Sequence, residues 1–179
     1  YKKTTVSLLS FKNLNAAISL VSLHMPHINL VTRSNGVGLD RDVELIRSTL
    51  HHASFQVTVS HCREISCWNS ILPRRKRFDA NIFLERIFPR WLSSAPKNFL
   101  IPNQERFPRR HLKHLGKINT VLCKTRHAQE IFSKYADAQY IGFTSLDRSI
   151  SGIDKDLGSC FHLAGRSTLK NTETLIDLW

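Results

Sequence analysis

The stretch from Ile28 to Leu50 constrains the fold more than any other part of this 179-residue chain. It begins with a short apolar run of strand length and continues into a turn, Ser34–Gly38, whose glycines can adopt backbone conformations closed to other residues. After the turn, Val43, Ile46 and Leu50 recur at helical spacing. A strand, a glycine turn and a helix predict the opening unit of a parallel α/β domain, in which such loops face a ligand at the carboxyl edge of the sheet.

The turn itself supplies the first candidate binding residues, Asn35, Gly36 and Gly38. Its pattern is G-x-G and lacks the third glycine of a dinucleotide-binding loop. Three acidic residues follow within positions 40–44, where they suit the positive end of the helix dipole but would repel a phosphate. The turn is therefore either a plain connection or a loop that faces a ligand.

Further short apolar runs alternate with helical stretches along the chain. The runs predict strands at Ser54–Val59, Phe78–Leu84, Asn98–Ile101, Ile118–Cys123, Ala138–Phe143 and Cys160–Leu163. A short basic helix is expected at Arg109–Leu115, and a second helix after an N-cap at Thr125, with Ala128, Ile131, Phe132 and Tyr135 on its apolar face. This alternation predicts an α/β fold, a Rossmann-like parallel sheet with helices on both faces.

Three segments differ in character. Residues 1–24 do not continue the sheet pattern, and we expect them to be an extension of unclear role upstream of a natural start at Met25. Residues 25–150 form the predicted amino-terminal domain. Residues 151–179 contain a polar linker and the first strand and helix of a second Rossmann-like domain, the helix beginning near Asn171.

Charge is the unusual part of the composition. The formal net charge is +12, and residues 61–114 hold 12 of the 26 Lys and Arg but 4 of the 14 Asp and Glu, so this segment supplies +8. A concentrated basic segment indicates an anionic partner, such as a membrane surface, nucleic acid or a phosphorylated substrate, unless it is simply a solvated surface.

The cysteines give no sign of a metal site or a disulfide framework. Cys62, Cys67, Cys123 and Cys160 lack C-x-x-C spacing, and Cys123 and Cys160 close apolar runs, so we expect those two to be buried thiols. This cysteine usage favours a reducing, cytoplasmic location, and no apolar stretch reaches the length of a membrane span. Peripheral contact with the inner face of an anionic membrane is compatible with the basic segment.

The carboxyl-terminal sequence FHLAGRSTLKNTETLIDLW resembles the start of the second domain of bacterial glycosyltransferases with two facing Rossmann domains, the GT-B architecture. Upstream, SNGVGLDRD, PNQERF and VLCKTRHAQEIF agree in order and spacing, so the resemblance covers residues 26–179 and is to group-1-type nucleotide-sugar transferases. Two departures stand out. The usual Lys-Gly is Lys170-Asn171 here, and the later donor motif with its Glu lies beyond residue 179.

The resemblance implies a site and a reaction. Gly165, Arg166 and Lys170 would bind the donor diphosphate, and the two cations would stabilise the charge that develops on the leaving group without a metal. The acceptor hydroxyl needs a base, and His61 and Glu105, each just after a predicted strand, are the candidate catalytic residues. The substrates implied are a nucleotide-sugar donor, with no other cofactor, and a lipid-linked or cell-envelope polysaccharide acceptor. We expect residues 1–179 alone to be inactive, because most of the donor pocket is absent.

Two other functions compete with this one. A basic α/β module that binds nucleic acid is the alternative, but aromatic residues are not interleaved with the basic run, and no helix-turn-helix, RNA-recognition or zinc pattern is present. A dinucleotide-binding enzyme is disfavoured by the short glycine pattern and by the lack of an acid after the second strand. The identity of the sugar, nucleotide and acceptor stays open.

Overall fold

The computed structural model describes residues 25–33, 38–64 and 77–143, and in the carboxyl-terminal part residues 152, 154, 158–159, 161–163 and 171–178. By the contacts between its residues the chain divides into two units, Tyr1–Ser145 and Leu146–Trp179. The predictions for residues 1–24 fall outside the described residues.

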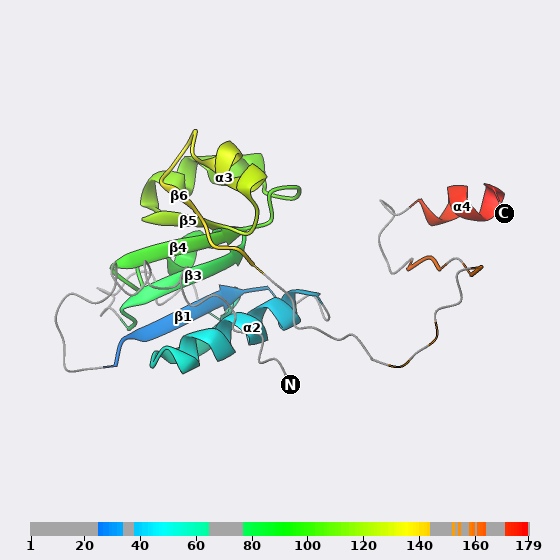
Figure 1. Cartoon of the computed structure of the whole chain (residues 1–179). Coiled ribbons are helices and arrows are strands. Elements are labelled where there is room, and N and C mark those ends of the chain that lie inside the picture. The colour runs from blue at the N-terminus through cyan, green and yellow to red at the C-terminus, as the bar shows by residue number, and fades with distance from the viewer. Residues whose placement is uncertain are drawn as a thin grey trace. The chain divides into compact units, whose positions relative to one another are not determined.

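The first unit is built on a parallel sheet, as the sequence predicts. Its strands are β1 (His27–Thr32), β2 (Gln56–His61), β3 (Ala80–Glu85), β4 (Lys97–Pro102), β5 (Thr120–Cys123) and β6 (Ala138–Tyr140), in the spatial order β2-β1-β3-β4-β5-β6. Every neighbouring pair is parallel. The chain therefore has an open, Rossmann-like sheet in which β1 lies between β2 and β3, where the direction of winding reverses. Figure 1 shows β1, β3, β4, β5 and β6 side by side in this sheet.

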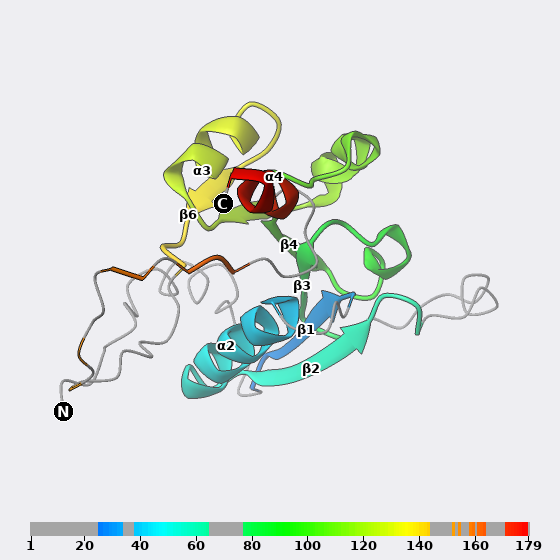
Figure 2. The same ribbon diagram turned by 90° about the vertical axis from the view of Figure 1, so that its right-hand side faces the viewer.

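Helices cover both faces of this sheet (Figure 2). Helix α2 (Gly38–His52) packs on one face through Leu39, Val43, Ile46 and Leu50, the periodic residues of the opening unit. The other face is covered by two 3-10 helices, η2 (Pro89–Trp91) and η3 (Arg109–Lys117), and by helix α3 (Arg126–Phe132). Alternate residues of the central strands serve the two faces, so β3 and β4 read as almost continuous apolar runs.

A row of buried amides crosses the sheet beneath η2. Asn29, Asn81 and Asn98 are partners in the strand register. Asn29 Nδ2 donates to Asn81 Oδ1 at 3.0 Å, and Asn81 Nδ2 donates to Asn98 Oδ1 and to the carbonyl of Trp91, both at 2.9 Å. Buried amides need hydrogen-bond partners, and these bonds join three strands and the η2 connection in one polar network.

Several predicted elements differ in extent or type. The basic helix after β4 is a 3-10 helix, and α3 ends at Phe132, so Tyr135 lies beyond it and is 56% exposed. The strand predicted at Cys160–Leu163 is not formed over the described residues 161–163, where Phe161 is 85% exposed. A strand gains its hydrogen bonds only from a neighbouring strand, and the described residues of the second unit include no strand. The helix predicted from Asn171 is present as α4 (Thr172–Leu178).

Candidate functional site

A pocket of about 360 Å³ lies at the carboxyl edge of the sheet. It is bounded by the start of α2 and by the residues at and just after the ends of β3, β4 and β5. Those described residues are Gly38, Leu39, Asp42, Leu84, Glu85, Ile101, Pro102, Asn103, Gln104, Glu105 and Lys124. Parallel α/β sheets bind ligands at this edge, beside the point where the winding reverses, and the volume is that of a small-molecule site.

Glu85, the last residue of β3, has a strained backbone. Its φ is +65°, and the N–H of Arg86 donates to the carbonyl of Leu84 at 2.8 Å, which closes a tight three-residue turn around it. A non-glycine residue with positive φ costs free energy, and such residues cluster at functional sites. The carbonyl of Glu85 also accepts from the N–H of Asn103 at 3.3 Å. The turn therefore joins the ends of β3 and β4 at the pocket.

Lys124 is held in place by contacts from two other segments. Its Nζ forms an ion pair and a hydrogen bond with the Asp42 carboxylate of α2, and lies 4.3 Å from the centre of the Phe143 ring. The residue follows β5 directly and precedes the N-cap of α3. Lys124 therefore ties α2, β5 and the segment after β6 together at one side of the pocket.

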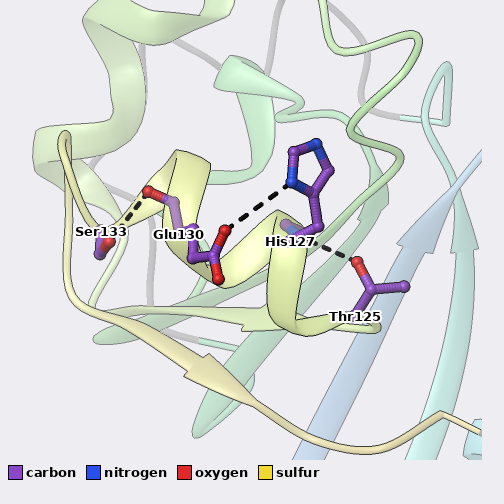
Figure 3. Close-up of polar contacts among 5 residues, drawn as sticks. Thr125, His127, Glu130 and Ser133 are labelled. Atoms are coloured by element: carbon purple, nitrogen blue, oxygen red, sulfur yellow. Dashed lines mark hydrogen bonds and ion pairs between the residues drawn. The ribbon is translucent and has the colours of Figure 1, made fainter.

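The N-cap fixes the residue after Lys124. Thr125 has an extended backbone, and its Oγ1 accepts from the N–H of Ala128 at 3.0 Å, as expected from the sequence. On the exposed side of α3, His127 lies 3.8 Å from the Glu130 carboxylate (Figure 3). Because the helix must begin at Arg126, Lys124 stays at the carboxyl edge of β5 rather than in the helix.

The charge of the pocket opposes that of the chain. Among the described residues that line it, three are carboxylates (Asp42, Glu85 and Glu105) and one is a cation, Lys124, which is already paired with Asp42. Asn103 and Gln104 add amides. Carboxylates and amides together can bind hydroxyl groups, because they offer both acceptors and donors. An arriving diphosphate would meet a net negative charge here.

The structure brings two of the predicted site residues together and separates a third from them. Gly38 and Glu105 line the same pocket. His61 ends β2, paired in register with Thr32, and is not one of the pocket residues. Its Nδ1 accepts from the N–H of Arg63 at 3.4 Å. The remaining predicted site residues, Asn35, Gly36, Gly165, Arg166 and Lys170, lie outside the described residues.

The pocket also contains Asp42, Glu85 and Lys124, which the sequence pattern did not mark as binding residues. Glu85 and Lys124 each stand directly after an apolar run that was predicted to be a strand. The rule that placed Glu105 at the carboxyl edge would have found both of them.

A second feature lies on the far side of the sheet from α2. The surface of η3 carries Arg109, Arg110, Lys113 and Lys117, all exposed, and none forms an ion pair within the described part of the chain. Leu115 is buried beneath them. We call these four cations the η3 surface.

Burial and neighbouring cations lower the pKa values of two histidines of η3. The pKa of His111 is lowered from its ordinary value, first by burial and then by Arg110, His114 and Arg86. The pKa of His114 is lowered by burial and by Lys113 and Lys117. His111 Nδ1 is buried with no hydrogen-bond partner. Each imidazole is therefore more readily neutral than an exposed histidine, in keeping with a positive local potential.

The described part of the chain holds no group of three or more His, Cys, Asp or Glu side chains that could bind a metal ion. Cys123 is buried, as expected, and burial raises the pKa of its thiol to about 11. Within the described residues, no helix combines the length and apolar character needed to cross a bilayer.

Comparison with known proteins found no family model, no curated protein and no solved structure that matches this chain.

Proposed function

We propose that the first unit is the acceptor-binding side of a glycosyltransferase that uses a nucleotide-sugar donor. The observation that carries the proposal is the pocket at the carboxyl edge, where carboxylates and amides converge beside the start of α2. Such groups suit a sugar, which presents many hydroxyls and no charge. The order of motifs that resembles GT-B enzymes supports the same assignment.

In this function Glu105 is the base. An acceptor hydroxyl donates its hydrogen bond to the Glu105 carboxylate, which takes the proton as the oxygen bonds to the anomeric carbon of the donor. The bond from that carbon to the diphosphate breaks, and the nucleoside diphosphate leaves with the electron pair. Arg166 and Lys170, assigned by resemblance, would stabilise its charge. The acidic pocket itself disfavours a diphosphate, which is consistent with a separate donor site.

Binding measurements on residues 1–179 test this proposal. Saturation-transfer NMR should show uncharged oligosaccharides in contact with the protein, and Glu105→Gln should weaken this binding because a charge-assisted hydrogen bond is lost. Glu130→Gln, which alters an exposed acid of α3 away from the pocket, is the matched control and should leave binding unchanged. Displacement of the oligosaccharide by a nucleoside diphosphate at the pocket would contradict the proposal.

The η3 surface favours a second, peripheral role. Four exposed cations on one short helix suit an anionic partner, and a lipid-linked acceptor would bring the protein to a membrane surface. We propose that the η3 surface contacts anionic lipid headgroups. A nucleic-acid-binding module is the alternative function, and the same cations would serve it through phosphate contacts.

A further inference from the structure

Two carboxylates of the pocket have no partner cation among the described residues. Glu85 and Glu105 both line it, and neither forms an ion pair within the described residues. Glu85 is half-buried, whereas Glu105 is exposed. The strained turn at Glu85 and the segment after β4 bring them to the same pocket from neighbouring strands.

The pocket cation does not compensate these charges. Lys124 is bound to Asp42 on one side and covered by the Phe143 ring on the other. Pairing with Asp42 leaves no net charge at that position, so the uncompensated charge of the pocket comes from Glu85 and Glu105. This local charge is negative although the formal net charge of the chain is +12. A pocket of this sign attracts a cationic ligand and repels an anionic one.

The ligand that this charge selects is larger than a metal ion. The pocket acids are not among any group of described side chains that could hold a metal. The volume, about 360 Å³, suits a sugar ring with its substituents. A protonated amine on that ring would donate charge-assisted hydrogen bonds to carboxylates that a neutral hydroxyl could engage only more weakly.

We propose that the pocket selects an acceptor sugar that carries a free, protonated amine over the same sugar with its amine acetylated. This inference rests on the proposed function, because it names the acceptor class for the pocket. Glu85 and Glu105 are the specificity-determining residues, and Lys124 acts as a positioning residue that holds Asp42 away from the ligand.

A matched pair of ligands tests the inference on residues 1–179. A glucosamine trisaccharide and its fully N-acetylated counterpart are titrated by calorimetry at about pH 6, where the free amines of the sugar are protonated. An ion pair that stays accessible to solvent changes affinity about 1.4- to 5-fold, so two carboxylates predict a preference of about 2- to 30-fold for the amine. The preference should shrink in about 1 M salt, where the screening length falls to about 3 Å.

Three variants identify the residues responsible. Glu85→Gln and Glu105→Gln should each remove part of the preference, and the double variant should remove most of it. Glu44→Gln is the control, because Glu44 is an exposed acid of α2 that pairs with Arg47 and does not line the pocket. Circular dichroism of each variant checks that the fold is kept.

The outcomes separate this inference from the proposed function. Equal affinity for the two trisaccharides in the unaltered protein would overturn the inference and leave the acceptor site standing. A preference that survives in the double variant would also overturn it, because the amine would then be recognised elsewhere. If neither trisaccharide binds, the proposed acceptor site fails and the inference fails with it.

Discussion

Thr125 fixes the position of the preceding residue, Lys124, because the Thr125 hydroxyl caps the start of α3. Thr125→Ala leaves the N–H of Ala128 without this partner and should lower the free energy of unfolding by about 1 kcal/mol. Ser133→Ala is the control, since its exposed hydroxyl donates only to the carbonyl of Glu130 near the helix end, and its effect should stay within about 0.5 kcal/mol. Urea denaturation measures both, and equal losses in the two variants would contradict the capping role.

His111 should make stability depend on pH. Its folded-state pKa lies below the ordinary value of 6.5, because of burial and of Arg110, His114 and Arg86. The unfolded chain therefore binds the proton more readily, so stability is complete above about pH 6.5 and is lost as the pH falls toward the folded-state pKa. His111→Leu removes this loss. The stability of the variant relative to the unaltered protein should therefore increase as the pH falls from about 7.5 to 5.

The matched control for this measurement is His127→Leu, which alters an exposed histidine of α3. Its stability relative to the unaltered protein should change little over the same range, apart from the weak ion pair with Glu130. A relative stability of His111→Leu that is flat with pH would show that His111 does not carry the effect.

The sequence could predict that a residue reaches the pocket where its place next to a strand or helix was sufficient information. Glu105 and Gly38 follow or precede elements that the sequence marks clearly, and both reach the pocket. His61 obeys the same rule, yet it lies at the end of the edge strand β2. The spatial order of the strands depends on how the connections between them pack. The hydrophobic pattern of a single strand does not reveal whether that strand is central or at the edge.

At the scale of elements, the buried row Asn29–Asn81–Asn98 should be a main source of stability. Asn81→Ala leaves Asn29 Nδ2 on β1 and Asn98 Oδ1 on β4 without their buried partner, and each such group costs about 1–3 kcal/mol. We expect a loss of at least about 2 kcal/mol in urea denaturation. Asn103→Ala, at a half-buried amide with no hydrogen bond from its side chain within the described residues, should cost less than about 1 kcal/mol. A loss of stability in Asn81→Ala as small as that in Asn103→Ala would show that the buried row is not a main source of stability.

Strands and the long helix were predictable because their apolar spacing is periodic. The connections were predicted less completely, because η2 and η3 are held by contacts with other segments. A short basic helix at Arg109–Leu115 was predicted but not its 3-10 form, and η2 was not predicted. Asn98 Nδ2, for example, donates to the carbonyl of Leu92 at 3.1 Å, just after η2. A prediction from local pattern places Asn98 in a strand but cannot show which connection its side chain will meet.

At the scale of the molecule, the local charge differs in sign between the pocket and the η3 surface. The pocket is acidic while the exposed cations of the η3 surface lie on a different part of the same unit. The net charge of +12 therefore describes neither location. Salt screens each electric field beyond about 8 Å at physiological ionic strength. The η3 surface can therefore attract an anionic surface while the pocket prefers uncharged or cationic ligands.

The η3 surface gives the last prediction. The protein should sediment with vesicles that contain anionic lipid and not with neutral vesicles, and high salt should release it. Each cation near an anionic surface contributes about 1 kcal/mol, so replacing Arg109, Arg110, Lys113 and Lys117 by Gln should weaken binding by up to about a thousandfold. A control with Arg41, Arg47, Arg63 and Lys134 replaced by Gln has the same net charge and alters exposed cations of other elements.

The two quadruple variants separate a docking surface from overall charge. If η3 binds the membrane, the control retains most of its vesicle binding while the η3 variant does not. Equal losses would mean that net charge alone attracts the protein, because both variants lose four positive charges. Titration of a short DNA duplex under the same salt conditions completes the test. Tighter binding to the duplex than to anionic vesicles, lost in the η3 variant, would assign the surface to nucleic acid and contradict the membrane contact.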